Sequence, residues 1–284
     1  MSKNKKEKRP FISKLIFVFL IIILFGIYAR YIGSKGLKIY EYGVTSENLE
    51  ENFDGFSIVQ ISDIKYGSTI FKDELKKIVN KINDLKPDIV VFTGDLVADE
   101  YKLSSSEEEN IINLLASIDP LIGKYSIKGD KDYKGNIYAN IMNKSDFTDL
   151  TNKSELIYYK GLTPIRIYGL GSLIKGKQDF DSTFKVEDDL TDLFDILLVH
   201  EPDTIDYVGN YDIDLMLSGH SLNGIINIPY VKNLYNIKGA EKYNNLEYEI
   251  NETKLYVSSG LGTNYLKSRL FNKPSISIIR LYKK

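Results

Sequence analysis

The sequence predicts an α/β fold built on a parallel sheet, and three features of the chain predict it. Short apolar runs alternate with segments in which apolar residues recur at helical spacing, the rhythm of βαβ units. The runs are apolar at nearly every position, as strands buried on both faces are. Polar side chains of metal-binding types follow several of these runs, at the strand ends where such folds build their sites.

The first 35 residues form a segment of a different kind. A cluster of basic residues, Lys3, Lys5, Lys6, Lys8 and Arg9, precedes an uncharged apolar run over residues 15–29. With Phe11 and Ile12 counted, the run is long enough to cross a bilayer core of about 30 Å at a rise of about 1.5 Å per residue. We therefore expect residues 1–35 to be a basic N-terminus and one transmembrane helix. A cleaved signal peptide is the alternative, but no clear small-x-small cleavage site follows the run.

Charge and composition limit the location and class of the protein. Basic residues on one side of the helix hold that side in the cytoplasm, so we expect a single-pass cell-membrane protein whose remaining residues lie outside the cytoplasm. The formal net charge of −2 argues against nucleic acid as a partner. The absence of cysteine excludes disulfides, thiolate metal sites and a cysteine nucleophile. About 250 residues remain after the N-terminal segment, and residues 36–284 are expected to form one domain.

The expected elements follow from the apolar pattern. A helix is predicted over residues 73–85, where Leu75, Ile78, Val79 and Ile82 share one face, and another over residues 107–118 after a serine-rich N-cap. Toward the C-terminus the helices become sparse while strands continue, which indicates two packed sheets flanked by helices. Strands are predicted over residues 56–61, 89–93, 125–128, 165–168, 196–199, 215–218, 225–228, 255–257 and 276–281.

Four side chains at strand ends point to a metal site. His200 and His220 are the two histidines of the chain, and each follows a predicted strand. Asp63 and Asp95 follow two earlier strands in equivalent places. The histidines could be buried structural residues and the aspartates could cap loops. Because all four lie at the ends of neighbouring strands, the pattern favours metal ligands.

Five motifs carry a resemblance to a known family. They are Ile61-Ser-Asp63-Ile-Lys65, Thr93-Gly-Asp95-Leu, Lys128-Gly-Asp130-Lys-Asp132, Val199-His200-Glu-Pro-Asp and Ser218-Gly-His220-Ser-Leu222-Asn-Gly. In order and spacing they resemble the motifs of calcineurin-like metallophosphoesterases, and residues 255–263 are similar to the closing segment of the membrane-anchored branch. The resemblance covers the chain from about Leu37 onward. It implies a four-layer α/β/β/α sandwich and a metal-dependent phosphoric ester hydrolase.

The departures from the family motifs affect one metal site more than the other. One site in the family uses the counterparts of Asp63, Lys65, Asp95 and Leu222, and this site has lost both of its histidines. The other uses the counterparts of Asp95, Asp130, His200 and His220, and all four of these can bind a metal. The resemblance therefore implies one divalent transition metal ion, with mixed ligands that admit Mn, Fe or Zn. Efficient two-metal catalysis is not expected.

Two lysines replace charge at the reduced site. Lys65 and Lys131 stand where the family has histidines, and Asp130 stands where it has asparagine. Two aspartates, two divalent ions and one hydroxide carry a formal charge of +1, and three aspartates, one divalent ion and two lysines carry the same. Without metal the residues alone carry −1, so an ion-pair cluster could also persist. We expect Asp63, Lys65 and Lys131 to take part in catalysis.

Two functions remain open from the sequence. The first is a membrane-anchored phosphoesterase with weak or altered hydrolysis; the second is a pseudoenzyme that binds a phosphate ligand outside the cytoplasm without turnover. By analogy with membrane-anchored relatives, the substrate would be a lipid-linked or nucleotide-linked phosphate ester of the cell envelope. Gly260 and Gly262 are expected to form a tight loop, and Lys267 and Arg269 to be solvated surface residues.

Overall fold

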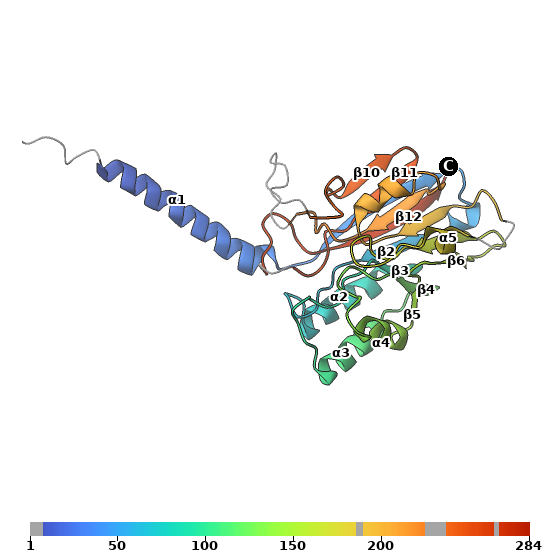
Figure 1. Ribbon diagram of the computed structural model, residues 1–284, viewed down its shortest axis with the longest axis horizontal. Helices are drawn as coiled ribbons and strands as arrows, with labels where there is room; N and C mark the ends of the chain where they lie inside the picture. The colour runs from blue at the N-terminus through green and yellow to red at the C-terminus, as the bar shows by residue number, and fades with distance from the viewer. Residues whose placement is uncertain (1–7, 186–189, 225–236, 264–266) are drawn as a thin grey trace, which may run out of the picture.

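Two six-stranded sheets pack face to face, with helices on their outer faces and one long helix projecting from the body (Figure 1). This computed structural model describes residues 8–185, 190–224, 237–263 and 267–284. The predicted strand at residues 225–228 lies outside the described residues.

The first sheet has the order β1-β12-β2-β3-β4-β5. Its central strands β2, β3 and β4 run parallel, as the βαβ rhythm predicts, whereas β12 pairs with β2 in the antiparallel sense. Strand β1 was not predicted, because it lies at the sheet edge and its side chains are mostly exposed or half-buried. The strands are β1 (Lys38–Ser46), β2 (Ser57–Ile61), β3 (Ile89–Phe92), β4 (Gly123–Ser126), β5 (Phe147–Asp149) and β12 (Ser275–Lys283).

The second sheet has the order β10-β11-β9-β8-β7-β6. Its four central strands are parallel, and the two edge strands, β6 and β10, are antiparallel to their neighbours. The prediction of a parallel sheet therefore holds for the four central strands of this sheet, and is wrong for its two edge strands. The strands are β6 (Lys153–Ile157), β7 (Ile165–Gly169), β8 (Asp195–Leu198), β9 (Leu215–Ser218), β10 (Glu247–Ile250) and β11 (Thr253–Val257).

Helices cover the outer face of each sheet. The predicted helix α3 begins as expected after Ser104, whose hydroxyl accepts a hydrogen bond from the Glu107 N–H while the Glu107 carboxylate accepts one from the Ser104 N–H. The α-helices are α1 (Lys8–Tyr28), α2 (Lys72–Leu85), α3 (Ser105–Ala116), α4 (Ile137–Lys144) and α5 (Phe180–Phe184). Shorter helical turns are η1 (Ala29–Gly33), η2 (Glu51–Phe53) and η3 (Pro202–Tyr207).

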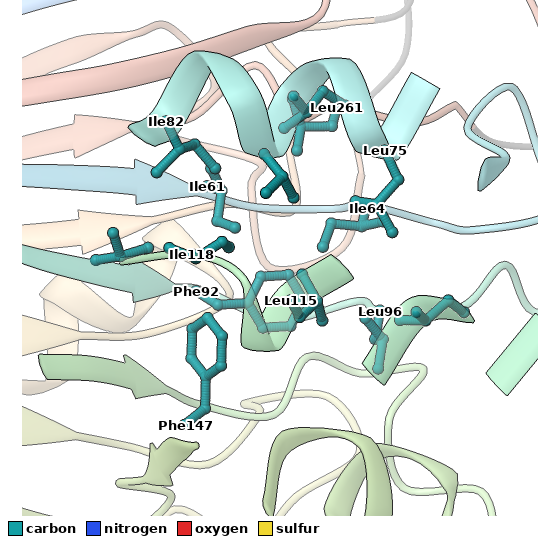
Figure 2. Close-up of a cluster of buried hydrophobic side chains, with 14 of the residues drawn as sticks. Ile61, Ile64, Leu75, Ile82, Phe92, Leu96, Leu115, Ile118, Phe147 and Leu261 are labelled. Carbon is teal, nitrogen blue, oxygen red and sulfur yellow. The ribbon is translucent and has the colours of Figure 1, made fainter. Parts of the chain in front are cut away.

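Three buried apolar clusters separate four layers. The first fills the space between the first sheet and α2, α3 and α4; Figure 2 shows Ile61 of the sheet beneath Ile82 of α2, and Phe92 beside Leu115 of α3. The second lies between the two sheets, and the third between the second sheet and α5 and η3. Alternation along a strand divides its side chains between clusters, since Val59 joins the first and Ile58 the second. This arrangement confirms the four-layer α/β/β/α sandwich.

The N-terminal helix stands apart from these layers. Residues Ile12–Gly33 form one apolar helical segment with a mean hydropathy of 2.6, long enough to cross a membrane. Most of its side chains are exposed, and the helix meets the body of the protein at its C-terminal end (Figure 1).

Candidate metal centre

The loops after β2, β3, β4, β8 and β9 bring all seven predicted site residues to one rim. Four of these residues have left-handed backbones: Asp63, Lys65, Asp95 and His220, with φ of 50°, 43°, 64° and 66°. Such conformations are uncommon for residues with a side chain and cluster at functional sites. The strand ends therefore position the side chains through tight, specifically shaped turns.

Asp130, His200 and His220 form one potential ligand group. One ligand atom from each lies within 4.8 Å of the others, and all three residues are buried. His200 Nε2 lies 3.6 Å from Asp130 Oδ1 and 3.4 Å from Asp95 Oδ1, and His220 Nδ1 lies 3.6 Å from Asp130 Oδ1. Ligands about 2.0–2.2 Å from one ion are separated by distances close to these. A second group, Asp63, Asp95 and His200, meets the same criterion and shares His200 with the first. The three donors of the first group thus converge with the spacing that a transition metal ion requires, and Asp95 reaches the same imidazole.

Hydrogen bonds to backbone carbonyls orient both imidazoles. His200 Nδ1 lies 2.6 Å from the Thr93 carbonyl oxygen, and His220 Nε2 lies 2.8 Å from that of Lys238. Because a carbonyl only accepts, each of these nitrogens donates its N–H. The opposite nitrogen of each ring therefore faces the carboxylates, as in histidines that bind metals.

Unpartnered polar atoms test whether a cation fits. Asp130 Oδ1 and His200 Nε2 are buried and have no hydrogen-bond partner among the described residues. An unsatisfied buried polar atom is costly, and a cation between these two would satisfy both. The residues present therefore fit a bound metal ion.

Burial and charge set the protonation of this group. Burial alone lowers the pKa of His200, but the carboxylates of Asp95 and Asp130 outweigh it and raise the pKa well above its ordinary value. Burial raises the pKa of Asp130, yet the nearby imidazoles of His200 and His220 and the ammonium of Lys131 hold it far below the usual range. In the metal-free protein a proton on His200 thus balances the carboxylates, and a metal ion would replace that proton.

Lys65 occupies the position between the other two aspartates. Its Nζ contacts Asp95 Oδ2 and lies 3.2 Å from Asp63 Oδ1, and all three side chains are buried. Burial lowers the pKa of Lys65, but Asp95 and Asp63 together raise it above its ordinary value. The ammonium therefore stays charged where two carboxylates converge.

Leu222 closes the same side of the site. A Cβ atom built on Gly260 would lie 2.4 Å from Leu222 Cδ2 and 2.9 Å from Asp63 Cβ, so the leucine side chain lies close to Asp63. Leu222 is buried and offers no ligand atom. Lys65 and Leu222, where the resemblance implies two histidines, thus lie beside Asp63.

Lys131 lies at the more open side of the centre. Its Nζ pairs with Asp130 Oδ2, and its side chain is 32% exposed. Burial lowers its pKa, and the Asp130 carboxylate raises it above the ordinary value. Its backbone N–H donates to Asp95 Oδ1 at 3.0 Å. The lysine therefore presents a positive charge where the site meets solvent.

Asp132 supports the loop without facing the metal group. Its carboxylate accepts hydrogen bonds from the N–H groups of Asp95 at 2.7 Å, Leu96 at 2.9 Å and Gly129 at 2.9 Å. Burial, then the charge of Asp95, raises its pKa to about 7. No role for Asp132 was predicted from the sequence. Its place two residues after Asp130 was the one feature of the sequence that could have indicated a role in this loop.

Arg269 corrects an expectation. Lys267 is exposed as predicted, but Arg269 is buried, with Nη1 donating to the Ser259 carbonyl at 2.7 Å and Nη2 to that of Gly260 at 3.0 Å. Nη2 also donates to the carbonyl of Gly262. The Gly262 N–H in turn donates to the Asp63 carbonyl oxygen at 2.7 Å. Arg269 therefore fastens the glycine loop that backs Asp63, and is not a surface residue.

Comparisons with known proteins agree with this geometry. The family model described as calcineurin-like phosphoesterase matches residues 56–224. The uncharacterized metallophosphoesterase YkuE of Bacillus subtilis is 32% identical, over 89% of this chain and 88% of its own. The UDP-2,3-diacylglucosamine pyrophosphatase LpxG of Chlamydia muridarum is 26% identical, over 91% of this chain and 93% of its own. The fold, the ordered motifs and these matches together establish that the chain belongs to the calcineurin-like phosphoesterase family.

Proposed function

We propose that the protein is a membrane-anchored hydrolase of a phosphoric ester that works with one divalent transition metal ion. The observation that carries the proposal is the contrast between the two halves of the centre. One half keeps converging ligand atoms from Asp130, His200 and His220. In the other half, the Lys65 ammonium contacts the carboxylates of Asp63 and Asp95.

The ligand set assigned here is Asp95, Asp130, His200 and His220. When bound, a divalent ion would polarise the phosphoryl group and lower the pKa of water, the chemistry that this family draws from its metals. The carbonyls of Thr93 and Lys238 hold the two imidazoles with their free nitrogens inward. Imidazole with carboxylate admits Mn, Fe or Zn.

The remaining charged residues are assigned to substrate charge. Lys131, partly exposed beside Asp130, is placed to stabilise a phosphoryl oxygen or the leaving oxygen. Lys65 offsets part of the negative charge of Asp63 and Asp95, which weakens the repulsion that an anionic substrate would meet. A lysine with a raised pKa releases its proton poorly near neutrality, so we propose weak or altered turnover compared with a histidine at the same place.

A binding module without turnover is the second candidate. The pairing of Lys131 with Asp130 favours it, because the lysine occupies a carboxylate oxygen of the proposed ligand set. Such a protein would hold a phosphate ligand but lack the proton donor and second cation of an efficient hydrolase.

The anchor and the substrate class complete the proposal. Residues 1–35 would hold the domain formed by residues 36–284 at the outer side of the cell membrane, with the N-terminus in the cytoplasm. The Arg269 N–H donates to Ala29 O at 3.0 Å, so the helix end is part of the folded structure, which supports a retained anchor over a cleaved signal. The name of LpxG describes a pyrophosphatase of a UDP-linked diacyl sugar. A lipid-linked or nucleotide-linked phosphate ester of the envelope is therefore the proposed substrate.

Metal analysis and kinetics on one preparation test the proposal. The metal-replete protein should hold close to one ion and slowly hydrolyse bis(p-nitrophenyl) phosphate. His200→Ala and His220→Ala should each lose the ion and the activity, whereas Asp63→Ala should keep the ion. An intact ion without turnover would favour the binding module, and two tightly held ions, or none, would refute the single-metal centre.

A further inference from the structure

The two chain segments that meet at the foot of the N-terminal helix carry basic but no acidic residues. Residues 29–40 and 267–275 contain no Asp or Glu, in a chain whose net charge is −2. The next acidic residue, Glu41, pairs with Arg280 Nε at 2.7 Å. We call the five exposed basic residues of these segments the basic collar: Arg30, Lys35, Lys38, Lys267 and Lys273.

Specific contacts hold the two segments together. Besides the bond from Arg269 N–H to Ala29 O, Arg30 Nη1 donates to Lys267 O at 3.0 Å. A Cβ atom at Gly33 would lie 1.9 Å from Arg269 O, so only glycine allows this close approach. The basic collar is therefore a fixed arrangement around the end of the apolar helix.

A cavity of about 360 Å³ opens inside this arrangement. Its volume falls within the range of about 300–1,000 Å³ that small-ligand sites show. Lys38 and Lys273 line it, with the rings of Tyr28, Tyr40 and Phe271, and no carboxylate belongs to its lining. Lys38 Nζ lies 4.2 Å from the centroid of the Tyr40 ring, which steers the ammonium along the cavity wall.

Asn272 fixes one wall of the cavity. Its Nδ2 donates to the carbonyls of Leu222 and Gly224, which holds the segment that carries Phe271 and Lys273 against the body of the protein. The two ammonium groups of Lys38 and Lys273 suit a ligand that carries a phosphate.

The position of the cavity beside the end of the helix indicates the class of its ligand. Tyr28 and Gly33 lie at the last turns of the segment that can span a membrane, so the cavity lies where lipid headgroups would be. Phe271 packs its ring 6.0 Å from Phe25 of the helix and is half exposed, as aromatic residues at a membrane surface are. Exposed basic residues next to a transmembrane helix attract acidic lipids.

We infer that this juxtamembrane cavity binds the phosphate of an anionic phospholipid. The inference rests on the proposed membrane anchor and is independent of the metal centre. A bound lipid would fix the height and tilt of the domain above the bilayer, because the cavity joins the helix end to the body of the protein. Free phosphate shares the chemistry of the ligand, so the experiment must separate the two sources.

Native mass spectrometry of the full-length protein, released from detergent micelles that contain added lipid, tests the inference. The parent protein should retain one phosphatidylglycerol and little phosphatidylcholine. The double variant Lys38→Gln, Lys273→Gln should retain phosphatidylglycerol on the order of tenfold more weakly. Its metal content and activity should equal those of the parent, since neither lysine belongs to the metal centre.

A matched control comes from the far edge of the second sheet. Lys153 and Lys160 are also exposed, and Lys160 Nζ lies 4.3 Å from the Tyr159 ring, much as Lys38 lies against Tyr40. The double variant Lys153→Gln, Lys160→Gln should retain phosphatidylglycerol like the parent, which shows that the loss is specific to the cavity.

Four results would overturn the inference. Equal retention of the two lipids, or of phosphatidylglycerol by both double variants, would remove the site. Displacement of the lipid by millimolar inorganic phosphate would assign the cavity to free phosphate. An intact mass that lacks the first 30 or so residues would refute the anchor and this inference with it, whereas loss of metal with lipid retained would refute only the metal centre.

Discussion

The Nζ atom of Lys65 lies 3.2 Å from Oδ1 of Asp63, with both side chains buried. The same ammonium contacts Asp95, so one lysine offsets half of the negative charge of two buried carboxylates. A positive charge that is part of the chain keeps this half of the centre assembled at any metal concentration. The ammonium also contacts one oxygen of each carboxylate, so a second metal ion would have to displace it to bind there.

Replacing the lysine by an apolar residue tests this compensation. Lys65→Met leaves the carboxylates of Asp63 and Asp95 buried without their cation, and should lower the free energy of unfolding by about 3–5 kcal/mol in the presence of a chelator. Urea unfolding measures the change. Excess Mn²⁺ should restore part of the loss, because an ion can then enter between the carboxylates. Lys76→Met on the exposed face of α2 is the control and should stay within about 0.5 kcal/mol of the parent.

The pH dependence of metal binding should follow His200. The pKa of this residue is raised in the metal-free protein, so it keeps a proton that an incoming ion must displace. Metal affinity should therefore rise with pH, by up to tenfold per unit while one proton is released. For the metal-free protein the sign is opposite: stabilisation by protonated His200 is complete below the unfolded pKa of about 6.5 and is lost as pH rises through the folded pKa.

Titration calorimetry in buffers of different ionisation enthalpy measures the released proton directly. Uptake of metal without proton release near neutral pH would show that His200 is already neutral there, and the ion-paired state of the metal-free site would be wrong.

Arg269 should be required for the loop that backs Asp63. Arg269→Met leaves the buried carbonyls of Ser259 and Gly262 without their donor and removes one of the two donors to the Gly260 carbonyl, and should destabilise the protein by about 2–4 kcal/mol. Arg269→Lys should recover only part of the loss, because one ammonium cannot match the planar fork of the guanidinium. Thermal unfolding measures both variants. Lys267→Met, an exposed neighbour, is the control, and an equal effect there would contradict the assigned contacts.

The sequence predicted the strand ends far better than it predicted the contacts behind them. Asp63, Asp95, His200 and His220 could be located because buried parallel strands are nearly all apolar, so polar residues at their ends stand out. Arg269 could not, since its role depends on three carbonyl groups that only the folded loop brings together.

The edges of the sheets were also hard to predict. Strand β1 pairs with β12 across more than 200 residues of sequence, and its alternation of exposed and half-buried positions has little apolar contrast. The boundary of β4 was displaced, because Gly123 and Lys124 begin the strand although their composition suggests a loop. The register of such strands is set by their neighbours, which local sequence does not report.

The orientation of the anchor should follow the basic residues that precede it. Protease added to intact cells should digest the folded domain and leave a short N-terminal fragment, because the positive charges hold the N-terminus in the cytoplasm. Immunoblotting against tags at each end measures this. Protection of the whole chain until lysis would reverse the orientation and place the metal centre in the cytoplasm.

Restoring the missing ligands tests whether the reduced centre limits catalysis. Position 65 lies between the two aspartates and the Leu222 side chain lies close to Asp63, so histidines at both positions can reach the same ion. Lys65→His with Leu222→His should bring in a second metal ion and raise phosphodiesterase activity, on the order of tenfold or more. Each change alone should do little, because three ligands hold an ion poorly, so the pair should be non-additive.

Adding Lys131→His should raise activity further, since an imidazole with a pKa near 6.5 transfers protons at about neutral pH. Lys76→His on α2 controls for adventitious metal binding. If the triple variant folds and holds two ions but hydrolyses no faster than the parent, the substrate pocket and not the metal centre limits the rate. The binding module would then be the better account of this protein.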